Sequence, residues 1–186
     1  MNRFLTLALG LVAVALSAAP AAAQVPGGLP GSGAQPQAPK KRMWCRDPAA
    51  QSLTFQIISR GAHRTEGRIR ITGVVKNVGE AVFESDPRQA TAAIYETSPG
   101  GRGIIKAQQS IARLEPNRTI TLEFERDWSI ATEFPPTYSL LITYDPDIYI
   151  DANKNNDDCN RKNNKKELTG AEINRQWQLR DSAKKP

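Results

Sequence analysis

Residues 119–128 read Thr-Ile-Thr-Leu-Glu-Phe-Glu-Arg-Asp-Trp, and this stretch decides the fold class. Ile120, Leu122 and Phe124 occupy every second position, and polar or charged residues fill the positions between them. In a β-strand such alternation places the apolar side chains on one face and the polar side chains on the other. The pattern is typical of an antiparallel sheet that buries one face and exposes the other.

The same two-residue period recurs elsewhere in the chain. It is present in SLTFQII (52–58), RIRITGVVKN (68–77) and YSLLITY (138–144), and a shorter run begins at Ala92. Stretches rich in Pro, Gly and Asn separate these runs. Alternating runs divided by turn residues predict an all-β fold, an antiparallel β-sandwich of about seven strands.

A short helix is predicted after the last strand, over about 170–181. Thr169 and Glu172 have the spacing of a capping box, and Ile173 and Trp177 are four positions apart on one helix face. These two apolar side chains either dock back on the domain or bind a partner. We prefer partner binding, because an exported module of this kind otherwise lacks an anchor.

The N-terminus predicts a signal peptide over residues 1–23. Arg3 precedes an apolar run, Phe4 to Ala18, and Ala21 to Ala23 offer small residues for cleavage. The run is shorter than the roughly 20 residues that span a bilayer. We therefore expect a bacterial protein that is periplasmic or secreted, with no membrane span in the mature chain.

The remaining chain divides into three parts. Residues 24–42 are rich in Pro, Gly and Gln, which predicts a disordered arm. The sandwich is expected over 43–169 and the helical tail over 170–186. Apolar residues make up only 39% of the whole chain, and many of them lie in the leader, so a large enzyme core is disfavoured.

Two cysteines, Cys45 and Cys159, lie in the exported part of the chain. In an oxidising compartment an even pair indicates a disulfide. Such a bridge would close a long loop, which the chain-entropy model values at about 4–5 kcal/mol at most. Metal binding by the two thiols is the weaker alternative, because neither has a neighbouring cysteine in a CxxC motif.

Charge and motif content argue against two other classes of protein. The net charge is +6, but the Lys and Arg residues are scattered and are not interleaved with aromatic residues, so we expect no nucleic-acid partner. The chain has one histidine, His63, in a polar turn, and it contains no nucleotide-binding or hydrolase motif. We therefore predict no catalytic residues and no enzyme activity.

The best candidate for a ligand site is an acidic, Asn-rich turn between residues 145 and 158. Oxygen-bearing side chains alternate there as in a calcium loop, but the usual glycine and the closing glutamate are absent. The alternative is a turn whose side chains bond to their own backbone. The candidate calcium ligands are Asp151, Asn153, Asn155 and Asp157.

Three motifs in order carry a family resemblance. Val75–Ala81 has the pattern V-x-N-x-G, and Ile111–Asn117 precedes a long strand with Asn117 where glycine is usual. Pro136–Asp147 and the acidic turn complete the series. Over roughly 53–169 the chain resembles CARDB domains, the cell-adhesion-related domains found in bacteria. The resemblance implies an immunoglobulin-like fold without a shared active site.

These observations together predict an exported, non-catalytic module that binds another envelope or extracellular macromolecule, either a protein or a polysaccharide. Two alternatives stay open. One is a calcium-dependent carbohydrate-binding or adhesion module, and the other is an accessory subunit of an envelope enzyme or complex. No cofactor other than calcium is expected.

Overall fold

The computed structural model describes residues 44–182, and the side chains of 44–180. The predicted signal peptide (1–23), the predicted arm (24–42) and the last four residues of the tail lie outside the described residues. Within the described part no helix is long and apolar enough to cross a membrane.

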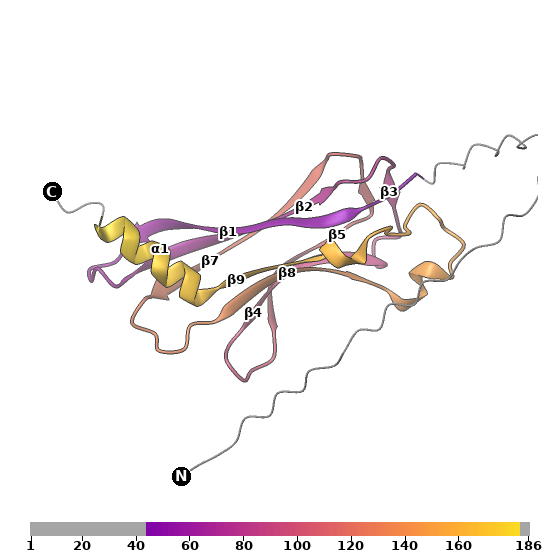
Figure 1. Cartoon of the computed structure of the whole chain (residues 1–186). Coiled ribbons are helices and arrows are strands. Elements are labelled where there is room, and N and C mark those ends of the chain that lie inside the picture. The colour runs from indigo at the N-terminus through magenta and orange to yellow at the C-terminus, as the bar shows by residue number, and fades with distance from the viewer. Residues whose placement is uncertain (1–43, 183–186) are drawn as a thin grey trace, which may run out of the picture. The chain divides into compact units, whose positions relative to one another are not determined.

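Two antiparallel sheets build the domain (Figure 1). One sheet has the order β1-β2-β7 and the other has the order β5-β4-β8-β9. The three strands of the first sheet are β1 (Pro48–Arg60), β2 (Glu66–Asn77) and β7 (Thr119–Ser129). The four strands of the second are β4 (Ala90–Thr97), β5 (Ile104–Ser110), β8 (Thr137–Tyr144) and β9 (Lys165–Thr169).

A third, small pairing joins β3 (Phe83–Glu84) to β6 (Arg113–Leu114). The described residues thus hold nine strands, two of them only two residues long, and the predicted antiparallel β-sandwich is confirmed. The alternation rule did not find β5, because nearly all of its side chains are exposed. It also did not find β9, in which only Leu168 is buried.

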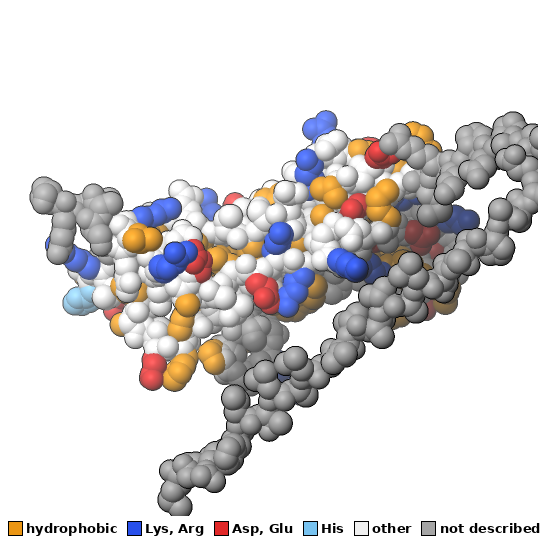
Figure 2. All heavy atoms as spheres, viewed as in Figure 1, with side chains coloured by type: hydrophobic (Ala, Val, Ile, Leu, Met, Phe, Trp, Pro, Cys, Tyr) orange, Lys and Arg blue, Asp and Glu red, His pale blue; other side chains and the backbone are white. Residues whose placement is uncertain are grey.

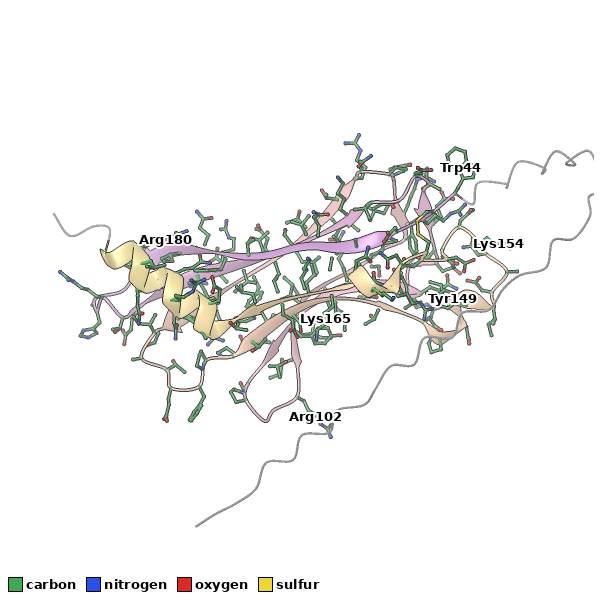
Figure 3. All side chains as sticks on the ribbon, viewed as in Figure 1. Trp44, Arg102, Tyr149, Lys154, Lys165 and Arg180 are labelled. Atoms are coloured by element: carbon green, nitrogen blue, oxygen red, sulfur yellow. A yellow bond between two sulfur atoms is a disulfide. The ribbon has the colours of Figure 1, made fainter. Side chains whose placement is uncertain are left out.

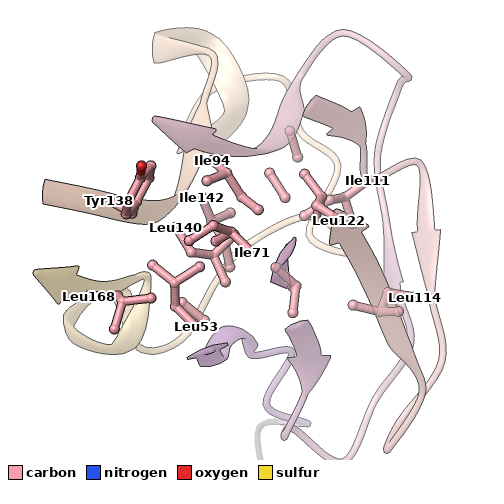
Figure 4. Packing of buried hydrophobic residues seen from close by; sticks show 14 of the residues in the cluster. Leu53, Ile71, Ile94, Ile111, Leu114, Leu122, Tyr138, Leu140, Ile142 and Leu168 are labelled. Carbon is pink, nitrogen blue, oxygen red and sulfur yellow. The ribbon is translucent and has the colours of Figure 1, made fainter. Parts of the chain in front are cut away.

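The core lies between the two sheets, as the two-residue period requires. Ile71 of β2 is paired with Phe124 of β7, and both point inward. From the opposite sheet, Ile94, Leu140 and Ile142 pack toward them (Figure 4). The charged residues between these positions face outward, where Glu125 of β7 pairs with arginines of β2.

Asn77, at the end of β2, explains the V-x-N-x-G motif. Its side chain is fully buried and donates to the carbonyl oxygens of Ala81 and Leu114, both at 2.8 Å. Its Oδ1 accepts from the backbone N–H of Asp47 at 3.2 Å and of Gly79 at 3.0 Å. Every hydrogen-bonding site of the amide is therefore occupied. The side chain joins the start of β1 to the turn after β2 and to β6.

Asn117 has a φ of 63°, which is the left-handed conformation that glycine adopts easily. Asparagine tolerates that conformation better than most residues with a side chain. It closes the turn between β6 and β7, and its backbone N–H donates to the carbonyl oxygen of Asn77 at 2.8 Å.

The C-terminal helix α1 (Gly170–Ser182) follows β9 directly, as predicted. Thr169 Oγ1 accepts from the backbone N–H of Glu172 at 3.2 Å, which is the cap expected from the sequence. Ile173 and Trp177 are both fully buried and belong to the core of the sandwich. The preferred prediction of a partner contact at these two side chains is therefore replaced by its alternative, docking on the domain.

The contacts of Trp177 explain this outcome. Its indole N–H donates to the carbonyl oxygen of Arg64 at 3.1 Å, and the guanidinium of Arg60 lies 4.1 Å from the ring centroid. A side chain at Gly67 would collide with the indole ring, so the glycine allows the close approach. The turn between β1 and β2 therefore provides the pocket that receives the helix.

We predict that Trp177→Ala lowers the free energy of unfolding by about 3–5 kcal/mol, because it leaves a cavity in the core. Leu179→Ala on the same helix is the matched control. Leu179 is 60% exposed, so its replacement should cost no more than about 0.5 kcal/mol. Urea denaturation of the two variants measures the difference. Equal midpoints would show that the helix does not contribute to the core.

Candidate functional site

The disulfide end of the sandwich is the first part of the site. Cys45 and Cys159 form the predicted bridge, with their Cα atoms 5.7 Å apart and 114 positions apart in sequence. The backbone N–H of Cys159 donates to the carbonyl oxygen of Arg46 at 2.9 Å, and the carbonyl oxygen of Cys45 accepts from Glu80 and Ala81. The bridge therefore ties the chain before β1 to the turn after β2 and to the loop after β8.

Gly79 is required by this arrangement. A Cβ at this position would lie 2.3 Å from the carbonyl oxygen of Cys45 and 2.8 Å from the backbone nitrogen of Asp47. Both neighbours are backbone atoms, which cannot move aside as a flexible side chain would. The glycine of the V-x-N-x-G motif thus packs directly against the segment that carries the first cysteine.

The second part of the site is the β8–β9 loop, residues 145–164, which contains the predicted acidic turn. It includes two short 3-10 helices, η1 (Pro146–Tyr149) and η2 (Arg161–Asn163). Hairpin loops usually have two to five residues, and loops longer than about 15 residues are uncommon. A loop of this length therefore indicates a structural or functional role.

The loop is shaped by one repeated contact. An Asp or Asn side-chain oxygen accepts a hydrogen bond from the backbone N–H two residues later, which is an Asx turn. The contact occurs five times, at 2.8–3.4 Å, with Asp145, Asp151, Asn153, Asp158 and Asn160 as acceptors. The Asp and Asn side chains of the loop therefore stabilise its own backbone conformation.

The four predicted calcium ligands are all in this loop. Oδ1 of Asp151 and Oδ1 of Asn153 accept from backbone N–H groups, and Oδ1 of Asn155 accepts from Arg46 at 2.6 Å. Oδ2 of Asp151 accepts from Asn156 at 2.7 Å and from Gln89 at 2.8 Å. The hydrogen bond from Asn156 is the largest cause that lowers the pKa of Asp151 below its usual range.

Asp157 shares no described hydrogen bond with the other three. The oxygens of Asp151, Asn153 and Asn155 are already used to hold the loop, and this supports the alternative of an Asx-turn structure. Within residues 44–180, the one group of three Cys, His, Asp or Glu side chains close enough to share a metal is Cys45, Asp47 and Cys159. Both of its sulfur atoms belong to the disulfide.

We predict that Asp151→Ala lowers the melting temperature without calcium, because three donors lose their acceptor, at about 1–3 kcal/mol for an unsatisfied group. Asp157→Ala is the matched control and should have little effect. For the unmodified protein we expect no rise in melting temperature with calcium up to about 10 mM, above the range of weak extracellular sites. A rise that Asp151→Ala removes would establish the calcium site.

Two buried carboxylates, Asp47 and Asp158, anchor the loop to the body of the domain. Asn163 donates to Asp47 at 2.9 Å, and Asn164 and the hydroxyl of Tyr144 donate to Asp158 at 2.7 and 2.9 Å. Burial, followed by the charge of Asp158, raises the pKa of Asp47. Burial likewise raises the pKa of Tyr144. Uncharged donors alone hold both carboxylates in the described region.

Two large apolar side chains are exposed on the loop, among polar neighbours. Ile150 is 80% exposed and Tyr149 is 40% exposed. Figure 3 shows Tyr149 at the same end of the domain as Lys154 and Trp44. The guanidinium of Arg161 lies 3.6 Å from the centroid of the Tyr149 ring and donates to its hydroxyl. The sequence did not single out either apolar residue, because each stands alone beside polar neighbours.

A hollow of about 360 Å³ lies beside Tyr149. Its wall combines β8, η1 and the segment from η2 to the start of β9. The residues that line it are Leu141, Ile142, Tyr144, Asp145, Pro146, Tyr149, Arg161, Asn164 and Lys165.

A larger hollow of about 620 Å³ lies at the opposite end, near the β1–β2 turn, but its chemistry is less suited to a ligand. Arg126, which lines it, is already paired with Glu96 and bonds the hydroxyl of Tyr138. On the visible face in Figure 2, Lys and Arg side chains are spread among acidic ones and form no continuous patch. His63 is exposed in the β1–β2 turn.

Comparison with known proteins assigns neither a family nor a function to the chain. No protein-family model matches the chain, and no curated protein matches it either.

Proposed function

We propose that the chain is an exported, non-catalytic module that binds another envelope or extracellular macromolecule through the β8–β9 loop. One observation carries this proposal. Asx turns and a disulfide hold the loop, yet it exposes Ile150 and Tyr149. Ordered loops of this length are usually functional.

Physical reasoning supports a binding role for such a loop. A flexible loop must lose conformational freedom when it binds, and this loss weakens affinity. Here five Asp and Asn side chains hold the backbone of the loop, and two apolar side chains, Ile150 and Tyr149, are exposed among polar neighbours. Aromatic side chains such as Tyr149 are enriched among the residues that contribute most to binding.

The disulfide supports the proposed location. Stable bridges form in secreted and periplasmic proteins and are rare in the cytosol. Together with the predicted signal peptide this favours a periplasmic or secreted protein. The resemblance to CARDB domains favours the same setting and suggests adhesion as the biological context, and we retain it as part of the proposal.

The proposal of a non-catalytic role follows from the chemistry at the loop. In and beside the loop, the carboxylates of Asp47, Asp151 and Asp158 accept from side-chain amides, and burial raises the pKa of Tyr144. His63 lies at the far end of β1 from the disulfide. A general base within hydrogen-bond reach of a nucleophile is what acid–base catalysis would need, and the loop offers no such pair among its described side chains.

We predict that Ile150→Asp weakens binding to the native envelope fraction by about tenfold or more, equivalent to about 1.4 kcal/mol. The charge would have to be desolvated in the interface. Phe134→Asp is the matched control, since Phe134 is 65% exposed and lies in the β7–β8 connection at the other end of β8. Binding of the purified, folded variants to the envelope fraction can be measured by sedimentation.

Retention of binding by Phe134→Asp and loss by Ile150→Asp would support the loop as the binding surface. If Ile150→Asp binds as well as the unmodified protein, the loop is not the contact surface. Equal loss in both variants would also contradict the proposal, because it would show a non-specific effect of added negative charge.

A further inference from the structure

The hollow beside Tyr149 is lined by an apolar wall and by charged groups. Leu141, Pro146 and Tyr149 form an apolar wall, and Asp145, Arg161 and Lys165 bring charged groups to the same small space. Its volume of about 360 Å³ lies within the range of about 300–1,000 Å³ that is usual for small-ligand pockets.

The charged groups keep hydrogen-bonding capacity for a ligand. Nε of Arg161 donates to the Tyr149 hydroxyl, and neither of its Nη atoms has an acceptor within residues 44–182. Oδ1 of Asp145 accepts from the backbone N–H of Asp147, which leaves Oδ2 without a described donor. Lys165 pairs with Glu167 at 2.6 Å. Both side chains are more than half exposed, so the ion pair is weak.

The mixture of charges restricts the ligand class. With Glu167, the partner of Lys165, the pocket region holds two negative and two positive charges, so neither an anion nor a cation gains a net attraction. A wholly apolar ligand would desolvate Asp145, Arg161 and Lys165 without a hydrogen bond, which is costly. An uncharged group that both donates and accepts hydrogen bonds and has an apolar face avoids each of these penalties.

A sugar ring has these properties. Its hydroxyl groups can donate to Asp145 and accept from Arg161 and Lys165, and its C–H face can pack on Tyr149 and Pro146. We propose that this pocket binds one uncharged sugar unit of an envelope or extracellular polysaccharide. The inference rests on the proposed function and names its partner class. It requires no calcium.

The chain offers a matched pair of double variants for the test. Arg161→Gln with Lys165→Gln removes two positive charges from the pocket, and Lys162→Gln with Lys166→Gln removes two from exposed neighbouring positions that do not line it. Both double variants change the net charge equally. The unmodified protein and both variants are compared on two probes: the native envelope fraction, and the same fraction digested with protease until only polysaccharide remains.

We expect the unmodified protein and the Lys162/Lys166 variant to bind the protease-treated polysaccharide with affinities within about twofold of each other. The Arg161/Lys165 variant should bind it at least about tenfold more weakly, a difference of about 1.4 kcal/mol. Periodate oxidation of the polysaccharide, which cleaves neighbouring hydroxyl pairs, should abolish binding. Melting temperatures of both variants report whether each is folded.

Three results would overturn the inference. If the protein binds the untreated envelope but not the protease-treated fraction, the partner is a protein: the proposed function stands and the sugar pocket does not. If both double variants lose binding equally, the attraction is a general charge effect. If the protein binds neither fraction, the proposed function fails together with the inference.

Discussion

The segment Cys45–Asp47 is the constraint on which the functional end of the domain depends. It precedes the first strand and belongs to neither sheet, so the packing of the core alone does not position it. The buried amide of Asn77 bonds the backbone N–H of Asp47, the carbonyl oxygen of Cys45 receives two N–H groups from the following turn, and the disulfide adds a covalent link. Gly79 allows this close packing because it has no side chain.

The β8–β9 loop is fixed by the same segment. Cys159 is linked to it through the disulfide and through the carbonyl oxygen of Arg46, and Asn163 reaches back to Asp47. Inside the loop, side-chain oxygens replace the backbone partners that a sheet would supply, so a long connection is ordered without regular strands. Binding can then occur without a large entropic cost, which is the physical basis of the proposed function.

Much of the fold could be predicted from the sequence, because half-buried strands carry a two-residue period in their own residues. The strands around Ile71, Leu122 and Leu140 were found in this way, as were the helix and the disulfide. The edge strand β5 was not found, since a strand without a buried face has no alternation to detect. Whether Trp177 meets its own domain or a partner was undetermined, because a helix presents the same apolar face in both cases.

The site was less predictable than the fold, for a related reason. Oxygen side chains at alternate positions suit both a calcium loop and a series of Asx turns, and the sequence alone does not distinguish a metal ion from a backbone N–H as the group that they bind. The proposed sugar pocket was also not predicted from the sequence. Asp145 and Arg161 lie near opposite ends of the loop and Lys165 begins β9, and they meet because β9 pairs with β8.

If the loop is preorganised, it is already formed before any partner binds. Amide hydrogen exchange of the free, oxidised protein, followed by NMR, measures this order. The N–H groups of Asn153, Asn155 and Asn160, which donate to Asx side chains, should exchange at least about tenfold more slowly than that of Lys154, which has no described acceptor. Exchange of all four at the rate of an unstructured chain would show that the loop is not preorganised.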